Sequence, residues 1–130
     1  MVIDTSAVAA ILFQEPEARA LAECIERDPV RLMSALNWLE SHLVIGGRFG
    51  PQGALIAESF FRESRIQIVS MDAAHARTAH SAWLRFGKGR HPAGLNLGDC
   101  CAYAASVLEQ QPLLCKGGDF SKTDLATVEY

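Results

Sequence analysis

Short apolar runs alternate along the chain with longer segments in which apolar and polar residues recur at helical spacing. The short runs, rich in apolar and β-branched residues, predict buried strands. We expect strands at MVID (1–4), RLMS (31–34), IQIV (66–69) and LLC (113–115), with VEY (128–130) as an added edge strand. The amphipathic segments predict helices that begin close to residues 5, 16, 35, 51, 73 and 96. Strands that alternate with helices predict an α/β fold, with a central parallel sheet covered by helices on both faces.

Capping residues and helix breakers support these boundaries. Thr5 or Ser6 can cap the first helix, Asp72 the helix that runs to about residue 86, and Asn96 the helix that runs to about residue 109. The segment GKGRHPAGLN (87–96) is a basic loop interrupted by Gly and Pro. Because the chain shows no internal repeat and no linker, we expect a single domain over residues 1–130.

Composition and charge narrow the classes of function. Apolar residues make up 49% and charged residues 21% of the chain, which is ordinary for a globular protein and argues against disorder. The formal charge of −3 argues against a strongly basic nucleic-acid-binding domain, although local charge matters more than the total. No apolar run approaches the roughly 20 residues of a membrane span, and Asp4 interrupts the stretch that a signal peptide would need. We therefore expect a cytoplasmic protein without a membrane segment.

The cysteines do not form a zinc motif. They are Cys24, Cys100, Cys101 and Cys115, with no CxxC pair and no Cys/His spacing typical of zinc. The adjacent pair would point about 100° apart on a helix, so the two thiols would rarely share a metal ion. We expect reduced thiols packed in the core.

Two acids stand at predicted strand ends. Asp4 ends the first strand, and Asp119 follows the LLC strand. Ligands of open parallel sheets bind at the carboxyl ends of the strands, so both positions are candidates for a functional site. The alternatives are that Asp4 only caps the next helix and that Asp119 is an ordinary turn residue.

Two further acids lie on predicted helices. Glu40 falls on an apolar stripe, where an unpaired carboxylate is costly to bury. The stripe consists of Leu36, Leu39, Leu43 and Val44. Asp99 begins an apolar, and therefore central, helix three residues after Asn96. Glu40 at the stripe's edge could instead reach solvent or an arginine, and Asp99 could belong to a capping box.

Together these acids come from distant parts of the chain toward one edge of the predicted sheet. Four carboxylates in one place repel one another unless protons or divalent cations neutralise them. Oxygen ligands without His or Cys suit Mg²⁺ or Mn²⁺. Such a site supports in-line displacement at phosphorus by a metal-activated water, as in a nuclease or a phosphatase.

Four blocks of the sequence resemble the PIN-domain ribonucleases of VapC-type toxin–antitoxin systems, in the right order and over essentially the whole length. The blocks are MVIDTSAVAAIL (1–12), the helix around Glu40, GKGRHPAGLNLGDCCAYA (87–104) and PLLCKGGDFSKTDL (112–125). The resemblance implies a PIN-like three-layer α/β/α sandwich. The acidic tetrad of that family would fall on Asp4, Glu40, Asp99 and Asp119.

The resemblance also implies an activity and partners. The activity is Mg²⁺- or Mn²⁺-dependent cleavage of RNA that leaves 5′-phosphate and 3′-hydroxyl ends. Asp4 and Asp99 would be the principal metal ligands, Glu40 and Asp119 would orient water or hold a second ion, and Ser6 would hydrogen-bond within the cluster. The partners are a second copy in a homodimer, a VapB-type antitoxin whose arginine could neutralise the acids, and operator DNA bound only through the antitoxin complex.

Contact with RNA requires positive charge near the acids. Arg85, Lys88 and Arg90, with His91 beside them, lie on or next to the basic loop that leads toward Asp99. We expect phosphate contacts there, and single-stranded RNA is the preferred target because its bases are accessible. The alternative is a solvated surface loop. For Trp38 and Trp83, packing in the core or in a dimer interface is favoured over stacking on bases.

Two other classes of function remain as alternatives. A PIN fold without useful catalysis could act as a binding module, through its antitoxin, in a DNA-binding repressor complex. A signalling receiver or an aspartyl phosphatase fits less well, because Thr5 and Ser6 follow Asp4 where those proteins need further acids.

Overall fold

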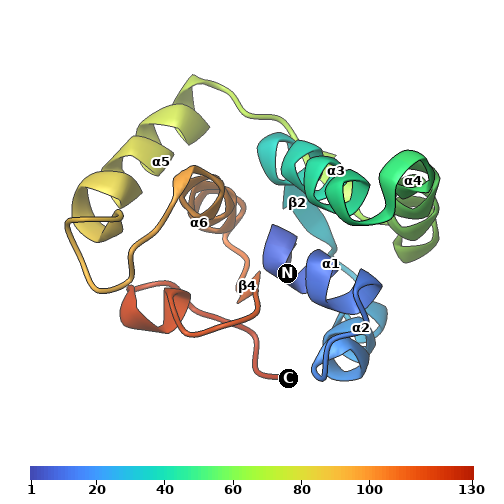
Figure 1. The fold of residues 1–130 in the computed structure, drawn as a ribbon. Helices are drawn as coiled ribbons and strands as arrows, with labels where there is room; N and C mark the ends of the chain where they lie inside the picture. The colour runs from blue at the N-terminus through green and yellow to red at the C-terminus, as the bar shows by residue number, and fades with distance from the viewer.

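The computed structural model describes residues 1–130 and is built around one parallel sheet (Figure 1). The strands are β1 (Val2–Ile3), β2 (Leu32–Ser34), β3 (Gln67–Val69) and β4 (Leu113–Leu114). Their order across the sheet is β3-β2-β1-β4, and every neighbouring pair is parallel. The predicted parallel sheet is confirmed. The predicted edge strand VEY is wrong: residues 128–130 form no strand, and only an isolated bridge joins the preceding Thr127 to Leu113.

Helices connect the strands in pairs. The helices are α1 (Thr5–Leu12), α2 (Ala18–Arg27), α3 (Ala35–Phe49), α4 (Gly53–Ser64), α5 (Ala73–Phe86) and α6 (Leu97–Glu109), with short 3₁₀ turns η1 (Gly50–Gln52) and η2 (Phe120–Lys122). Each helix pair spans from one strand to the next along the chain, as parallel neighbours require. None of the helices has both the length and the apolar character needed to cross a bilayer.

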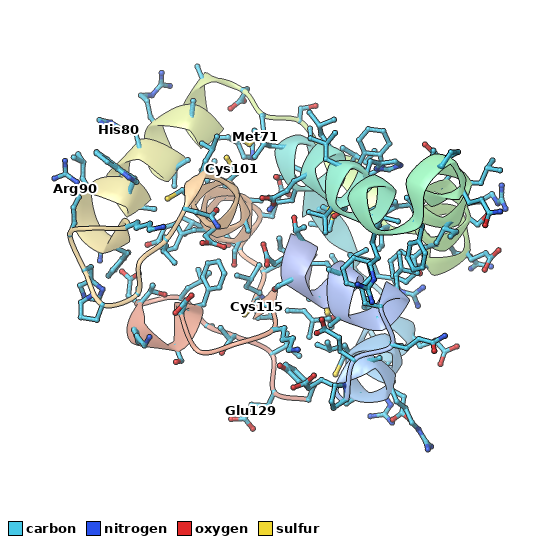
Figure 2. All side chains as sticks on the ribbon, in the orientation of Figure 1. Met71, His80, Arg90, Cys101, Cys115 and Glu129 are labelled. Atoms are coloured by element: carbon cyan, nitrogen blue, oxygen red, sulfur yellow. The ribbon has the colours of Figure 1, made fainter.

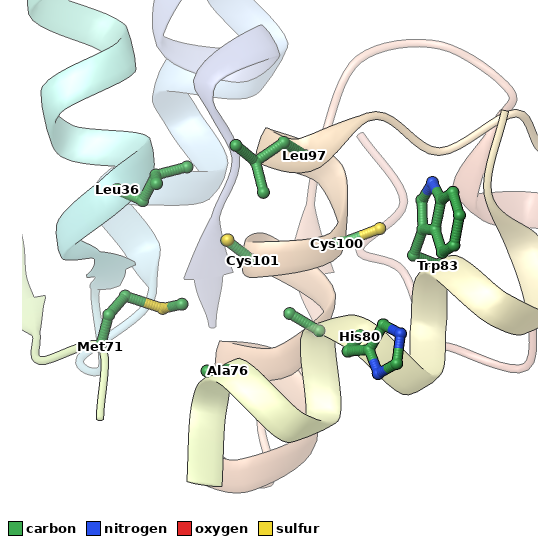
Figure 3. Close-up of a pocket in the computed structure, with 9 residues that line it drawn as sticks. Leu36, Met71, Ala76, His80, Trp83, Leu97, Cys100 and Cys101 are labelled. Atoms are coloured by element: carbon green, nitrogen blue, oxygen red, sulfur yellow. The ribbon is translucent and has the colours of Figure 1, made fainter. Parts of the chain in front are cut away.

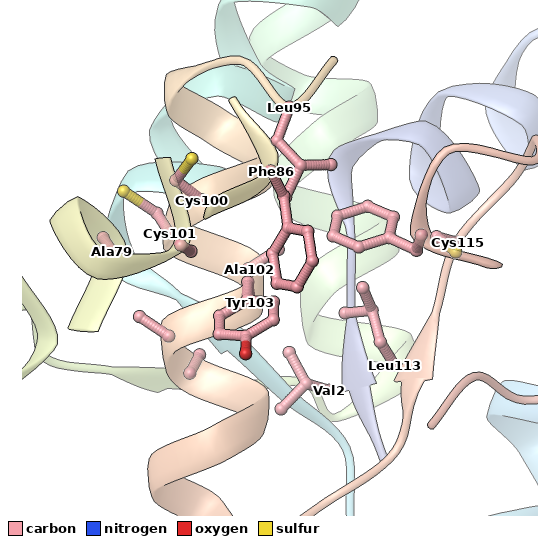
Figure 4. Close-up of a cluster of buried hydrophobic side chains, with 14 of the residues drawn as sticks. Val2, Ala79, Phe86, Leu95, Cys100, Cys101, Ala102, Tyr103, Leu113 and Cys115 are labelled. Carbon is pink, nitrogen blue, oxygen red and sulfur yellow. The ribbon is translucent and has the colours of Figure 1, made fainter. Parts of the chain in front are cut away.

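Alternate strand residues face opposite sides of the sheet and define two cores. Val2 and Leu113 pack with α5 and α6 in one core, which Figure 4 shows together with the buried thiols of α6. Ile3 and Leu114, the next residue of each strand, pack with α1 to α4 in the other core. The sheet therefore lies between two helical layers, and the predicted three-layer α/β/α sandwich is confirmed.

The strand order places a topological switch point between β1 and β4. The chain adds β2 and then β3 on one side of β1, and it returns to add β4 on the other side. In open α/β sheets, ligands bind outside the carboxyl ends of the strands at such a point. Asp4 follows β1 directly, and its backbone N donates to the carbonyl of Leu114 at 2.9 Å. The fold thus places Asp4 in this crevice.

Three of the four cysteines pack as predicted. All four are free thiols, and three of them are buried. Burial raises the pKa of Cys100 to about 11 and of Cys115 to about 12, so these thiols stay protonated at neutral pH. The predicted core packing is confirmed for Cys100, Cys101 and Cys115, whereas Cys24 is only half-buried.

Candidate active site

Asp4 is a buried carboxylate at the end of β1. Asp4 is only 3% exposed to solvent. Oδ2 accepts hydrogen bonds from the backbone N of Ser6 at 2.9 Å and from Ser6 Oγ at 2.5 Å, and Oδ1 accepts one from Asn37 Nδ2 at 3.3 Å. The pKa of Asp4 is raised to about 6, mainly by burial; the hydrogen bonds from Ser6 oppose this shift, and the charges of Asp99 and Glu40 add to it. Asp4 does cap α1, but its charge remains poorly compensated.

The side chain of Glu40 extends from α3 toward the same site. Thr5 Oγ1 donates to its Oε2 at 2.6 Å, and the carboxylate lies against Gly98 at the start of α6. A Cβ added to Gly98 would come within 2.5 Å of Oε2. Glycine is therefore the residue that leaves room for the Glu40 carboxylate.

The apolar stripe that singled out Glu40 does not face the core. Leu39 and Leu43 are 51% and 68% exposed, whereas Asn37, Ser41 and Ile45 are almost completely buried. The prediction of a buried stripe was wrong because the neighbouring helices α1 and α6 cover a different face of α3. Glu40 lies beside that buried face and is half-buried.

Asp99 lies in the first turn of α6. Its Oδ2 accepts from the backbone N of Asn96 at 2.8 Å, and Asn96 Oδ1 accepts from the backbone N of Asp99 at 3.0 Å, so a capping box is present. Burial raises the pKa of Asp99, the hydrogen bond from Asn96 lowers it, and the charges of Glu40 and Asp119 raise it. The cap uses one carboxylate oxygen and leaves Oδ1 without a protein donor.

Asp119 is the outer member of the group. It is exposed, and its Oδ1 lies 3.3 Å from Lys122 Nζ. Its charge nevertheless contributes to the raised pKa values of Asp99 and Cys115. The structure therefore brings Asp4, Glu40 and Asp99 within electrostatic reach of one another and couples Asp119 to Asp99.

Ser6 connects the two strand ends of the crevice. Its Oγ donates to Asp4 and accepts from the backbone N of Lys116, in the loop after β4, at 2.9 Å. The Lys116 side chain turns away to Glu15 and Glu17, so it does not neutralise Asp4.

Asn37 is the member of this site that the sequence did not reveal. Asn37 is 0% exposed. Its Nδ2 lies 3.3 Å from Asp4 Oδ1, 3.3 Å from Thr5 Oγ1 and 3.1 Å from the carbonyl of Gly98. Its only local signal is the position three residues after Ser34, which predicts an ordinary helix start. Its partners lie up to 61 residues away in sequence and belong to other elements.

The donor set fits a hard divalent cation in its chemistry. Carboxylate oxygens are the ligands that Mg²⁺ and Mn²⁺ prefer, and no ion pair in the structure involves Asp4, Glu40 or Asp99. No three or more His, Cys, Asp or Glu side chains are arranged so that they could hold a metal ion by themselves. Mg²⁺ commonly uses one or two protein carboxylates, with waters and substrate phosphates as the other ligands.

The basic residues predicted to contact RNA differ in their surroundings. Arg85 is exposed but already has protein partners, with its Nη2 2.6 Å from Asp124 Oδ2 and its Nη1 3.4 Å from Tyr103 Oη. The guanidinium of Arg90 lies 4.1 Å from the ring centre of Trp83, at the outer edge of the molecule beside α5 (Figure 2). Lys88 is exposed and forms no ion pair. The loop itself is closed by two backbone hydrogen bonds of 3.0 Å, from Lys88 N to the carbonyl of Leu95 and from Leu95 N to the carbonyl of Phe86.

Comparisons with known proteins identify the family and agree with the fold. The family model for the PIN domain matches residues 1–125. A VapC ribonuclease of Mycobacterium bovis is 45% identical over 128 residues, and a VapC ribonuclease of Mycolicibacterium smegmatis is 47% identical over 128 residues; each match covers at least 98% of both chains. The structure of Mycobacterium tuberculosis VapC20, described as a sarcin–ricin-loop-cleaving toxin, superposes with a TM-score of 0.79 at 17% identity over 99% of this chain and 98% of that one. A chain of a toxin–antitoxin complex from Klebsiella pneumoniae superposes with a TM-score of 0.73, also at 17% identity. This chain therefore belongs to the PIN domain family, among its VapC ribonucleases.

Proposed function

We propose that this chain is a metal-dependent endoribonuclease and the toxin of a type II toxin–antitoxin system. The observation that carries the proposal is the buried, uncompensated charge at the switch point of the sheet. Asp4 is 3% exposed, its pKa is raised to about 6, and none of Asp4, Glu40 and Asp99 forms an ion pair. A site of this kind gains most from a divalent cation.

In this proposal Asp4 and Asp99 hold Mg²⁺ or Mn²⁺, and Glu40 and Asp119 orient the attacking water or hold a second ion. A bound ion of this type lowers the pKa of a water ligand and offsets charge on the phosphate and the leaving oxygen. Ser6 holds Asp4 in place through its 2.5 Å hydrogen bond. Hydrolysis by in-line attack at phosphorus leaves a 5′-phosphate and a 3′-hydroxyl.

The RNA would approach over the basic loop. Lys88 and Arg90 are the residues that we propose for phosphate contact, because Arg85 already has Asp124 and Tyr103 as partners. This contact is electrostatic, so it should weaken as salt is added.

The proposed partners are a VapB-type antitoxin and a second copy of the chain. An antitoxin arginine inserted between the acids would neutralise them, and operator DNA would be bound only through that complex. We propose that the second copy packs over the apolar cavity of about 450 Å³ between α3, α5 and α6 (Figure 3). It is the largest cavity of the molecule, and eight of its nine lining residues are hydrophobic, including Trp83 and Leu97.

The state of the cysteines supports a proposal for the cellular compartment. All four cysteines are free thiols, as in proteins of a reducing compartment, so we place the chain in the cytoplasm with its RNA.

We also treat residues 1–130 as one PIN domain, because β1 and β4 come from opposite ends of the chain and pair in one sheet.

The test is cleavage of RNA by the chain purified without its antitoxin. Total RNA would be incubated with Mn²⁺ or Mg²⁺, and the cut ends would be mapped. We expect discrete cuts with 5′-phosphates that are lost with a chelator and in Asp99→Asn and Glu40→Gln. Glu63→Gln, which removes an exposed carboxylate of α4, is the control and should cut normally.

The outcomes separate the candidate functions. Cutting that persists in both variants would overturn the assignment of the acids. Failure to cut any RNA, with operator DNA still bound in the antitoxin complex, would replace the nuclease by the binding-module function.

A further inference from the structure

Asn37 joins three segments that are far apart in the sequence. It lies in α3, which contacts both α1 and α6 (Figure 1). Its side-chain amide touches Asp4 after β1, Thr5 at the start of α1 and the carbonyl of Gly98 in α6. Burying an amide is costly unless its donors and acceptor are satisfied, and here every polar atom of the side chain has a partner.

The orientation of this amide follows from its neighbours. Ser34 Oγ accepts from the backbone N of Asn37 at 3.1 Å, so its own hydrogen is free to be donated to Asn37 Oδ1 at 2.5 Å. The amide nitrogen must therefore face the acids. Its two hydrogens are shared among three acceptors, with distances of 3.1 to 3.3 Å.

Thr5 extends the influence of Asn37 to Glu40. The Thr5 hydroxyl has one hydrogen, and its 2.6 Å contact with Glu40 Oε2 is much shorter than its 3.3 Å contact with the carbonyl of Asn37. Thr5 therefore donates to Glu40 and accepts from Asn37 Nδ2. The third partner, the Gly98 carbonyl, belongs to the residue immediately before Asp99.

We propose that Asn37 is a positioning residue of this site: its neutral amide fixes the Asp4 carboxylate, the Thr5–Glu40 pair and the backbone that carries Asp99 in one arrangement. An Arg or Lys in this place would neutralise the acids, whereas an amide orients them and leaves their negative charge for a divalent ion. The proposal rests on the proposed function. Asn37 itself is fully buried, so in this proposal it acts only through its neighbours and touches neither the RNA nor the ion.

The test compares Asn37→Ala and Asn37→Ser with Ser41→Ala. Ser41 is one turn further along α3, is 1% exposed and hydrogen-bonds the carbonyl of Asn37 without contacting any of the acids. The measurements are the melting temperature, the affinity for Mn²⁺ in the absence of RNA, by the electron paramagnetic resonance of free Mn²⁺, and kcat and KM for RNA cleavage.

We expect Asn37→Ala to lose roughly 10- to 100-fold in Mn²⁺ affinity and in kcat, as is usual when residues that orient metal ligands are removed. KM for RNA should not change, because Asn37 lies beneath the site. Asn37→Ser keeps one hydroxyl donor and should recover part of the loss, while Ser41→Ala should bind Mn²⁺ normally. If Asn37→Ala does not fold, the same measurements on Asn37→Ser decide.

Three results would overturn the proposal: unchanged Mn²⁺ affinity in the folded Asn37 variants, an equal loss in Ser41→Ala, or a change confined to KM. If the wild-type chain cleaves no RNA while the Mn²⁺ affinities separate as expected, the positioning role stands and the proposed nuclease function fails.

Discussion

The contact between Gly98 and Glu40 offers the sharpest test of the site. In Gly98→Ala the new methyl group would lie 2.5 Å from Glu40 Oε2, 2.7 Å from Oε1 and 2.9 Å from Cδ, all closer than real contacts allow. The carboxylate must withdraw by about 1 Å, and it would then lose its 2.6 Å hydrogen bond from Thr5. A displacement of about 1 Å at a catalytic group can cost about 100-fold in rate, which corresponds to about 2.7 kcal/mol of barrier.

The fold itself should tolerate the same substitution. Gly98 is within a helix, where Ala is favoured over Gly by about 1 kcal/mol, and this gain offsets part of the crowding. We expect the free energy of unfolding to stay within about 1 kcal/mol of the wild-type value. Gly47→Ala in α3 is the control, because nothing lies within 4 Å of its added Cβ and it should change neither stability beyond that range nor cleavage.

Single-turnover cleavage of a fluorogenic RNA, with thermal unfolding in parallel, would measure both effects. Because the predicted damage acts through Glu40, Gly98→Ala should add little further loss in the Glu40→Gln background. Cleavage by Gly98→Ala within about threefold of wild type would refute the reasoning. So would an equal loss in the two backgrounds, since the methyl group would then act on something other than Glu40.

Three further predictions concern charge and accessibility. Because burial, with Glu40 and Asp99 as charged neighbours, raises the pKa of Asp4, its stabilising contribution is complete below about pH 4 and is lost as the pH rises through about 6. Relative to Asp4→Asn, the metal-free wild type should lose about 3 kcal/mol of unfolding free energy over that interval in chemical denaturation, and Mn²⁺ at pH 7 should restore stability. A pH-independent difference between the two proteins would contradict this prediction. Lys88→Ala should raise KM for RNA and reduce the slope of log KM against log salt concentration by about one unit. An unchanged slope would exclude the phosphate contact. Without denaturant, a thiol reagent should modify only Cys24 quickly, because the other three thiols are buried, and rapid labelling of a second thiol would contradict the packing.

The positions of Asp4 and Asp99 were predictable because their signals are local. Asp4 ends a strand, and Asp99 follows a capping residue by three positions. The choice of Glu40 depended on an apolar stripe that proved to be exposed, so the residue was chosen on a pattern that does not describe its burial. The basic loop was equally visible, but pairing of Arg85 with Asp124, 39 residues later, could not be read from it.

By itself, the sequence determined the order and type of the main elements and, within about two residues, where the helices begin, since hydrophobic periodicity and capping depend on neighbours a few residues apart. Only the tertiary structure decided which face of α3 is buried, where the carboxylate of Glu40 fits and what Asn37 holds together. Those outcomes depend on how α1, α3 and α6 pack at the switch point, and on hydrogen bonds between residues as much as 61 positions apart. Burial and hydrogen-bond partners are properties of the packed layers, so no local pattern along the chain can specify them.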